Sequence, residues 1–472
     1  MSFASIHFIF LFFPLVFLLY TLAPRGNWRN GVLVFSSLVF FAWVDFQNLG
    51  LLVLFILVNF LVGNWLGHLQ RRAQPKASRW VMWAAVLLNL GFLSFYKYLG
   101  FFEQTLGQLI SWQVPFEKPG LILGLSYLTF SSLSYILDVY HQTAQTEKNL
   151  LTFSAYLVMF PKLIQGPIAL YKHMAPQQNP SQAKWDDLAW GTRRFILGLA
   201  KKVIVADSLA IAANRVFAVD PQRLGAGVAW FGLLAYTAVI YFDFAGYTDM
   251  ALGLGRMFGF RLPENFNAPY LSRSITDFWR RWHITLTAWF RTYVFIPLEF
   301  KRRRTKFLRQ QSNILVVFLL TGLWHGASWN FVIWGGYFGL ILALEASGWE
   351  KRLKRAPRAL QHVYALLIVI IGWVFFRITD VHNWGPFFGA LIGLNGFTHL
   401  ESLRSLNILF YIPMLVVAIL LCMPFWTKLE RKLMSQTRLS KALVDLVLYG
   451  VFLLAVSYIL SNGFQVFMYA RF

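Results

Sequence analysis

Apolar segments long enough to cross a lipid bilayer recur along nearly the whole chain. Only 13% of its 472 residues are charged and 57% are hydrophobic, whereas a soluble domain carries roughly a quarter charged residues. Since about 20 apolar residues span the hydrocarbon layer, we predict a single-domain, all-α polytopic membrane protein over residues 1–472. It should contain about 11–13 membrane helices plus re-entrant and interfacial helices. The predicted spans lie near residues 5–22, 31–45, 49–67, 80–98, 120–140, 151–170, 188–210, 226–258, 311–346, 360–378, 386–426 and 443–461.

The net charge of +23 is concentrated in short loops between these segments. Loops 71–79, 301–309, 351–358 and 428–441 hold 20 of the 43 Lys and Arg residues. Basic loops mark the cytoplasmic side and lie well against anionic head groups, so they predict membrane lipids, not nucleic acid, as partners. Segment 8–22 has its basic residues after it, which indicates a retained first span with the N-terminus outside the cell.

Several kinds of chemistry have no sequence support. Cys422 is the only cysteine, so a disulfide or a thiolate metal site is not expected. The chain also lacks the HExxH, CxxC and GxSxG patterns of zinc enzymes, dithiol sites and serine hydrolases. We therefore predict neither a bound metal nor a bound cofactor.

The stretch LTGLWHGASWNFVIWGG, residues 320–336, places a titratable ring inside an apolar run. Basic loops flank this run of about 40 residues, so it must enter the membrane and return. Its four glycines would allow close helix approach or a broken helix. An ionisable residue at such a depth is expensive, which favours a function for His325 over a hydrogen-bonding role between helices. Ser328 could share a helical face with it, and Asn330 is a further polar neighbour.

A second polar cluster lies at 273–300, where His283 is the other candidate for chemistry, with an ordinary interfacial role as the alternative. We expect one amphipathic helix here, lying in the head-group layer. Asp277 could pair with Arg280 or Arg281 on it. One face of this helix would present Phe278, Trp282, Thr285 and Trp289.

Asp243 and Asp249 lie in the apolar segment upstream of this cluster. Arg256 and Arg261 follow them. We expect the two carboxylates to pair with arginines or to cap broken helices, since an uncompensated charge is costly in apolar surroundings.

Long stretches of the chain resemble one known family. They are DFAGYTDMALGLGRMFGFRLPENFNAPYLSRSITDFWRRWHITLTAWFRTYVFIPL and LWHGASWNFVIWGG, together with GLSYLTFSSLSYILDVY and FPKLIQGPI. They are similar to the membrane-bound O-acyltransferase (MBOAT) family, in particular the bacterial branch of alginate O-acetyltransferase membrane subunits and their peptidoglycan- and cellulose-acetylating relatives. The resemblance implies that His325 is catalytic and that His283 is the second important polar residue. It also implies a bacterial inner membrane location.

The resemblance implies acetyl transfer from cytoplasmic acetyl-CoA, as a substrate, to an extracytoplasmic polysaccharide, through a periplasmic SGNH-type acetyltransferase partner. A histidine, with an ordinary pKa of about 6.5, suits the role of general base that such a transfer needs. The candidate substrate-binding residues around the two histidines are Trp324, Ser328, Asn330, Asp277, Arg280 and Arg281.

Two other functions stay open. One is a D-alanyl transferase of the lipoteichoic-acid type, whose donor is a carrier protein. The other is a transporter, in which intramembrane histidines and carboxylates also occur. The absence of repeat symmetry argues against the transporter. The acceptor polysaccharide could be alginate, peptidoglycan or cellulose.

Overall fold

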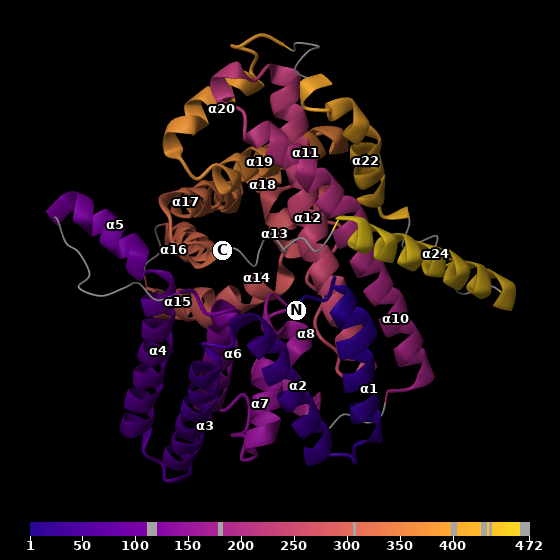
Figure 1. Ribbon diagram of the computed structural model, residues 1–472. Helices are drawn as coiled ribbons and strands as arrows, with labels where there is room; N and C mark the ends of the chain where they lie inside the picture. The colour runs from indigo at the N-terminus through magenta and orange to yellow at the C-terminus, as the bar shows by residue number, and fades with distance from the viewer. Residues whose placement is uncertain are drawn as a thin grey trace. The chain divides into compact units, whose positions relative to one another are not determined.

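A computed structural model describes residues 1–110, 120–177, 183–304, 308–397, 404–425, 432–433 and 437–462. Every regular element in these ranges is a helix (Figure 1), which confirms the predicted all-α class. The chain forms two compact units. One contains Met1–Phe195 and Thr248–Glu264, and the other contains Ile196–Tyr247 and the described residues of Asn265–Met468. Parts of the basic loops 301–309 and 428–441 lie outside the described residues.

Six helices of the described chain are long and apolar enough to cross a membrane. Two shorter apolar helices, Phe8–Leu22 and Ile408–Leu421, add to them. The helices of the first unit begin with the π-helix η1 (Phe8–Phe12) and end in α10, which continues into the second unit. They are α1 (Phe13–Leu22), α2 (Asn27–Asp45), α3 (Leu49–Arg71), α4 (Pro75–Lys97), α5 (Leu99–Ile110), α6 (Leu125–Tyr140), α7 (Leu150–Val158), α8 (Phe160–Leu163), α9 (Tyr171–Met174), η2 (Ala175–Gln177) and α10 (Trp185–Ala200).

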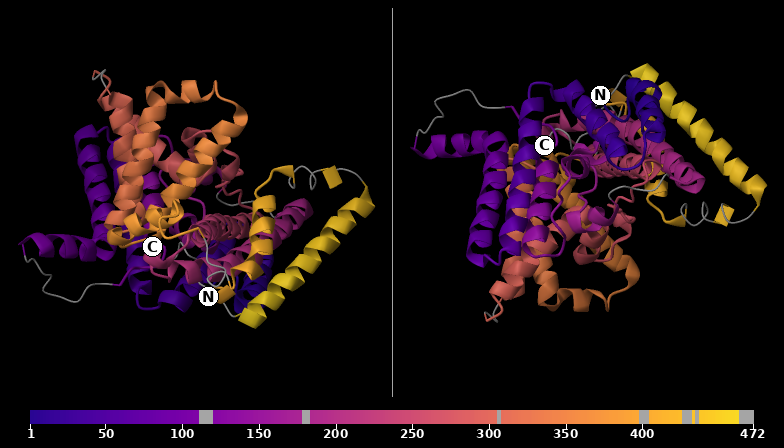
Figure 2. Two further views of the ribbon diagram at one scale, coloured as in Figure 1. Left: turned by 90° about the horizontal axis from the view of Figure 1, so that it is seen from above. Right: turned by 90° about the horizontal axis from the view of Figure 1, so that it is seen from below.

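The second unit contains the C-terminal part of the chain, and its last described helix, α24, runs without interruption (yellow in Figure 2). Helix α12 (Ala226–Met257) begins in this unit and ends in the first. The other elements are η3 (Lys201–Ala206), α11 (Asp207–Phe217), η4 (Pro221–Arg223), η5 (Pro269–Leu271), α13 (Ile275–Arg281), α14 (Ile284–Phe290), η6 (Arg291–Phe295), α15 (Ile296–Lys301), α16 (Arg309–His325), α17 (Trp329–Leu344), η7 (Glu345–Trp349), α18 (Glu350–Leu353), α19 (Arg358–Arg377), η8 (Val381–Asn383), α20 (Trp384–Leu391), α22 (Ile408–Leu421) and α24 (Arg438–Asn462).

Two of the predicted spans are not single helices. The segment 151–170 breaks at Met159, where the backbone is extended between α7 and α8. The described residues of segment 386–426 include two separate helices, α20 and α22. Gly393 and Gly396, which follow α20, have positive φ angles, and so does Asn407, which directly precedes α22. Left-handed residues of this kind cannot continue an α-helix.

One of the two carboxylates of α12 pairs as we predicted. Asp249 pairs with an arginine, Arg194, at 2.7 Å. Asp243 pairs with a lysine, Lys202, at 2.7 Å, and both side chains are almost fully buried. Lys202 also pairs with Asp207 at 2.7 Å. Helix α12 is unbroken, so neither carboxylate caps a helix break; instead, both compensate charges on helices distant in the sequence.

Helices α16 and α17 form an antiparallel hairpin within the second unit (Figure 1), as the flanking basic loops predicted. Gly322 of α16 lies against Gly335 and the backbone of Phe331 on α17, and a Cβ at Gly322 would overlap the Phe331 carbonyl oxygen. Gly335 is equally close to the carbonyl oxygen of Phe318. The two backbones therefore touch, which confirms the close approach expected of these two glycines.

Candidate active site

His325 is the last residue of α16, at the turn of the hairpin. The next residue, Gly326, is extended (φ −164°, ψ 153°), so the helix ends there. Ser328 precedes α17 as its N-cap residue, also in an extended conformation. The prediction that Ser328 shares a helical face with His325 is therefore wrong, because the two residues flank a turn rather than occupy one helix.

His283 lies at a break between two short helices. We expected one amphipathic helix over 273–300, but α13 ends at Arg281 and α14 begins at Ile284. His283 itself is left-handed, with φ +44° and ψ 52°. The backbone groups at the break are satisfied by an adjacent segment: Asn267 N donates to Arg281 O at 2.9 Å, and Ile284 N donates to Asn265 O at 3.0 Å. This pairing supplies the hydrogen bonds that a continuous helix would have made.

Asn265 also fixes the tautomer of His283. The backbone N–H of Thr285 donates to Asn265 Oδ1 at 3.1 Å, so that atom is an acceptor. The same oxygen lies 3.2 Å from His283 Nδ1. Nδ1 must therefore donate, which leaves the lone pair of the neutral ring on Nε2. This Nε2 is buried and makes no hydrogen bond within the described residues.

The environment of His283 keeps the ring neutral. His283 is fully buried, and it lies between α13 and α14, neither of which is a candidate span. Burial lowers the pKa of the His283 imidazole to about 3, because an imidazolium would lose its hydration there. His283 is thus an uncharged ring at neutral pH, with one nitrogen lone pair directed away from Asn265.

The structure brings the two histidines together although 41 residues separate them in the sequence. Their ring centroids lie 6.4 Å apart, and the ring of Trp324 lies 5.9 Å from His283 and 4.8 Å from His325. His325 is only 3% exposed and packs edge to face against Trp334 and Phe376. The result is a pair of imidazoles inside an aromatic enclosure.

Sequence reasoning missed the indole groups of this enclosure. Trp334 and Trp373 are almost completely buried, and their rings stack with centroids 6.3 Å apart. Their Nε1–H groups find no hydrogen-bond acceptor within the described residues. A buried donor without an acceptor costs about 1–3 kcal/mol. The tryptophan content of the hairpin was a sequence signal for Trp334 only, because Trp373 lies in α19.

The other candidate residues lie in two places in the second unit. Asn330, near the start of α17, donates to Phe375 O at 3.1 Å and contacts the Ser328 hydroxyl, so it braces the hairpin turn. Asp277 pairs with Arg281 at 2.9 Å, as the i,i+4 spacing predicted, while Arg280 is exposed.

The Asp277–Arg281 pair lines a cleft of about 530 Å³. Arg273 and His362 also line this cleft, together with Leu271 and Pro424. Two arginines against one carboxylate give the cleft a net positive charge, which suits an anionic ligand.

Glu345 holds the start of α13 in place. Its buried carboxylate accepts hydrogen bonds from Ile275 N (2.8 Å), from Thr276 N (2.7 Å) and from the Thr276 hydroxyl (2.6 Å). A carboxylate at a helix N-terminus satisfies backbone donors and interacts favourably with the helix dipole. No sequence pattern indicated this contact, because Glu345 follows α17 and lies about 70 residues from α13.

The structure is that of a helical membrane protein that buries two histidines side by side. The family model described as MBOAT, membrane-bound O-acyltransferase family, matches residues 122–379. This chain belongs to that family and is an O-acyltransferase, and its six candidate spans identify it as a multi-pass membrane protein.

Named relatives are similar over most of the chain. A probable alginate O-acetylase AlgI of Azotobacter vinelandii is 42% identical, over 84% of this chain and 79% of the relative. A peptidoglycan O-acetyltransferase of Helicobacter pylori is 33% identical, over 82% of this chain and 79% of the relative. A teichoic acid D-alanyltransferase of Bacillus subtilis is 30% identical, over 74% of this chain and 90% of the relative.

Proposed function

We propose that this protein transfers acetyl groups from cytoplasmic acetyl-CoA for the O-acetylation of an extracytoplasmic polysaccharide, in a bacterial inner membrane with its N-terminus outside. A periplasmic SGNH-type partner would complete the transfer. The observation that carries the proposal is the buried pair of imidazoles 6.4 Å apart in a chain of this family. The names of the alginate- and peptidoglycan-acetylating relatives support a polysaccharide as the acceptor.

In the proposed reaction His325 is the general base. An acceptor hydroxyl gives its proton to the His325 imidazole while the hydroxyl oxygen bonds to the thioester carbonyl carbon. The tetrahedral intermediate then expels the CoA thiolate, which takes the proton back from the imidazolium. The indole N–H groups of Trp334 and Trp373 are the proposed donors to the developing oxyanion, since both lack an acceptor in the described residues.

His283 is proposed to orient a reacting group rather than to act as the base. Its pKa, near 3 because of burial, makes it a poor proton acceptor at neutral pH. Its Nε2 lone pair can instead accept a hydrogen bond from the acceptor hydroxyl. The aromatic rings around both histidines exclude water, which favours transfer over hydrolysis of the thioester.

We expect Asn265→Ala to lower the rate of acetyl transfer about tenfold, because His283 would lose the partner that fixes its tautomer. The measurement is kcat at matched amounts of folded protein. Asn267→Ala is the control, since Asn267 is exposed and contributes a backbone N–H to the same break. Equal activity of the two variants would remove Asn265 from the site.

The proposed donor carries several phosphate charges, and basic side chains near the second-unit site would attract it. Arg303 and Arg304 are exposed, whereas Arg302 is held by Asn313 at 2.7 Å. The cleft with Arg273 and Arg281 is a second basic surface. Attraction by exposed charges acts over about 8 Å at physiological ionic strength, so it raises the local donor concentration without taking part in the chemistry.

The test is release of CoA from acetyl-CoA by the purified protein in the presence of its periplasmic partner. We expect Arg303→Gln with Arg304→Gln to raise KM for acetyl-CoA about threefold and to leave kcat nearly unchanged, the pattern of lost uniform binding. Arg71→Gln with Arg72→Gln removes the same charge from another exposed loop and should have little effect.

The same assay decides between the two enzymatic functions. The D-alanyl alternative draws support from the teichoic acid D-alanyltransferase relative. A carrier-protein donor would have to dock as a folded protein, and free acetyl-CoA would then not be consumed. Activity restored only by an acylated carrier protein would contradict the acetyl-CoA proposal.

A further inference from the structure

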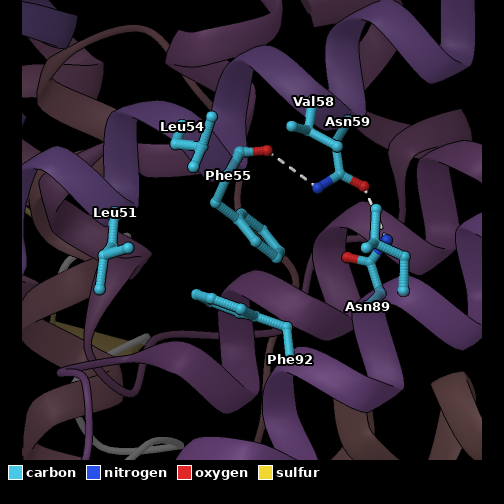
Figure 3. Close-up of a pocket in the computed structure, with 8 residues that line it drawn as sticks. Leu51, Leu54, Phe55, Val58, Asn59, Asn89 and Phe92 are labelled. Carbon is cyan, nitrogen blue, oxygen red and sulfur yellow. Dashed lines mark hydrogen bonds between the residues drawn. The ribbon is translucent and has the colours of Figure 1, made fainter.

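A small groove opens between α3 and α4, both of which are candidate membrane spans of the first unit. Its volume is about 120 Å³ (Figure 3). Apolar side chains form its walls, and two asparagines lie at one end. The lining residues are Leu51, Leu54, Phe55, Val58, Asn59, Leu88, Asn89 and Phe92.

The two asparagines leave one acceptor unused. Asn89 Nδ2 donates to Asn59 Oδ1 at 2.8 Å and to Ala85 O at 2.9 Å. Asn59 Nδ2 donates to Phe55 O at 2.9 Å. Asn89 Oδ1 is buried and accepts no hydrogen bond within the described residues. Asn89 as a whole is only 1% exposed, and its oxygen points toward the rings of Phe55 and Phe92 (Figure 3).

The depth of the groove limits which molecule can supply the missing donor. Asn59 lies ten residues after the start of α3 and twelve before its end, or about 15 Å or more from either end of the helix. The hydrocarbon layer is about 30 Å thick, so the groove lies near its middle. Lipid head groups lie at the interfaces and cannot reach this depth, and the acyl chains there carry no donor. A membrane helix can bring a hydroxyl or amide donor to the midplane.

The size of the groove fits one inserted side chain. An apolar cavity of about 150 Å³ stays dry and admits one small ring, and this groove is slightly smaller. Leu54 and Leu88 flank it with 56% and 52% of their surfaces exposed. They offer an apolar surface on which the rest of a helix could pack.

We propose that this groove docks a transmembrane helix of a partner protein, which inserts one Ser, Thr, Asn or Gln side chain and donates a hydrogen bond to Asn89 Oδ1. The site belongs to the first unit and does not depend on the acyltransferase chemistry. An interhelical hydrogen bond of this kind is worth about three- to fivefold in affinity. A lipid chain has no donor, so only the proposed helix would gain this affinity.

The experiment uses the full-length protein in phosphatidylcholine vesicles. The probes are two synthetic Leu/Ala transmembrane peptides with a photoreactive leucine beside the central residue. One peptide has Ser at its centre and the other has Leu. Crosslinks are located by mass spectrometry. We expect the Ser peptide to label α3 and α4 with half-saturation at a three- to fivefold lower concentration than the Leu peptide.

Two variants keep the test decisive. Asn89→Leu should remove the preference for Ser, and Leu54→Trp should fill the groove without disturbing the asparagine pair and so abolish labelling by both peptides. Leu61→Ala, at a position of α3 that is 63% exposed and outside the groove, is the control. Equal labelling by the two peptides would assign the groove to lipid chains and overturn the proposal. Association of two copies of this protein that Leu54→Trp abolishes would also overturn it.

Discussion

His325→Ala is expected to lower acetyl transfer at least 100-fold, because loss of a general base typically costs 10² to 10⁴ in rate (order of magnitude). Membrane insertion should be preserved, since the substitution makes the segment more apolar. His325→Gln retains most of the side-chain volume inside the aromatic enclosure and should be equally inactive. The measurement is CoA release per folded protein in detergent, in the presence of the periplasmic partner.

The matched control is His382→Ala, which removes an exposed histidine from the same unit. It should retain nearly full activity. We expect His283→Gln to fall between the two, because its proposed role is to orient a group rather than to accept a proton. If His325→Ala kept more than about a tenth of the wild-type rate, another group would have to be the base.

Gly335→Ala is expected to destabilise the protein by about 3 kcal/mol, the upper end of the usual cost of overpacking. A methyl group there would overlap the carbonyl oxygen of Phe318, and backbone cannot move aside as a flexible side chain can. The hairpin that holds His325 would open. Thermal unfolding in detergent, followed by fluorescence-detected size exclusion, measures the effect.

The adjacent glycine provides the control. At Gly336 the nearest atom to an added methyl group is Leu319 Cδ2 at 3.6 Å, an ordinary contact. Alanine forms helices better than glycine by up to about 1 kcal/mol, so Gly336→Ala should be neutral or stabilising. Similar melting temperatures for the two variants would show that the backbones do not touch at Gly335.

Local and periodic features of this protein could be predicted from the sequence. Apolar composition determines the membrane class. The basic loops on either side of 311–346 predicted a hairpin, because basic loops favour the same side of a membrane and a chain that enters between them must return. The pairing of Asp277 with Arg281 was also predictable, since four residues make one helical turn. His325 was a candidate for chemistry because an ionisable ring in an apolar segment is rare.

Contacts between distant segments were decided by the tertiary structure alone. The partner of Asp243 is Lys202, 41 residues earlier, and no local rule prefers it to the arginines that follow. The helix break at His283 exists because the backbone of Asn265 and Asn267 replaces the lost helical hydrogen bonds. A periodic pattern describes one helix at a time, so the sequence could single out each histidine as a candidate. The distance of 6.4 Å between their ring centroids depends on how the helices pack, and no such pattern predicts it.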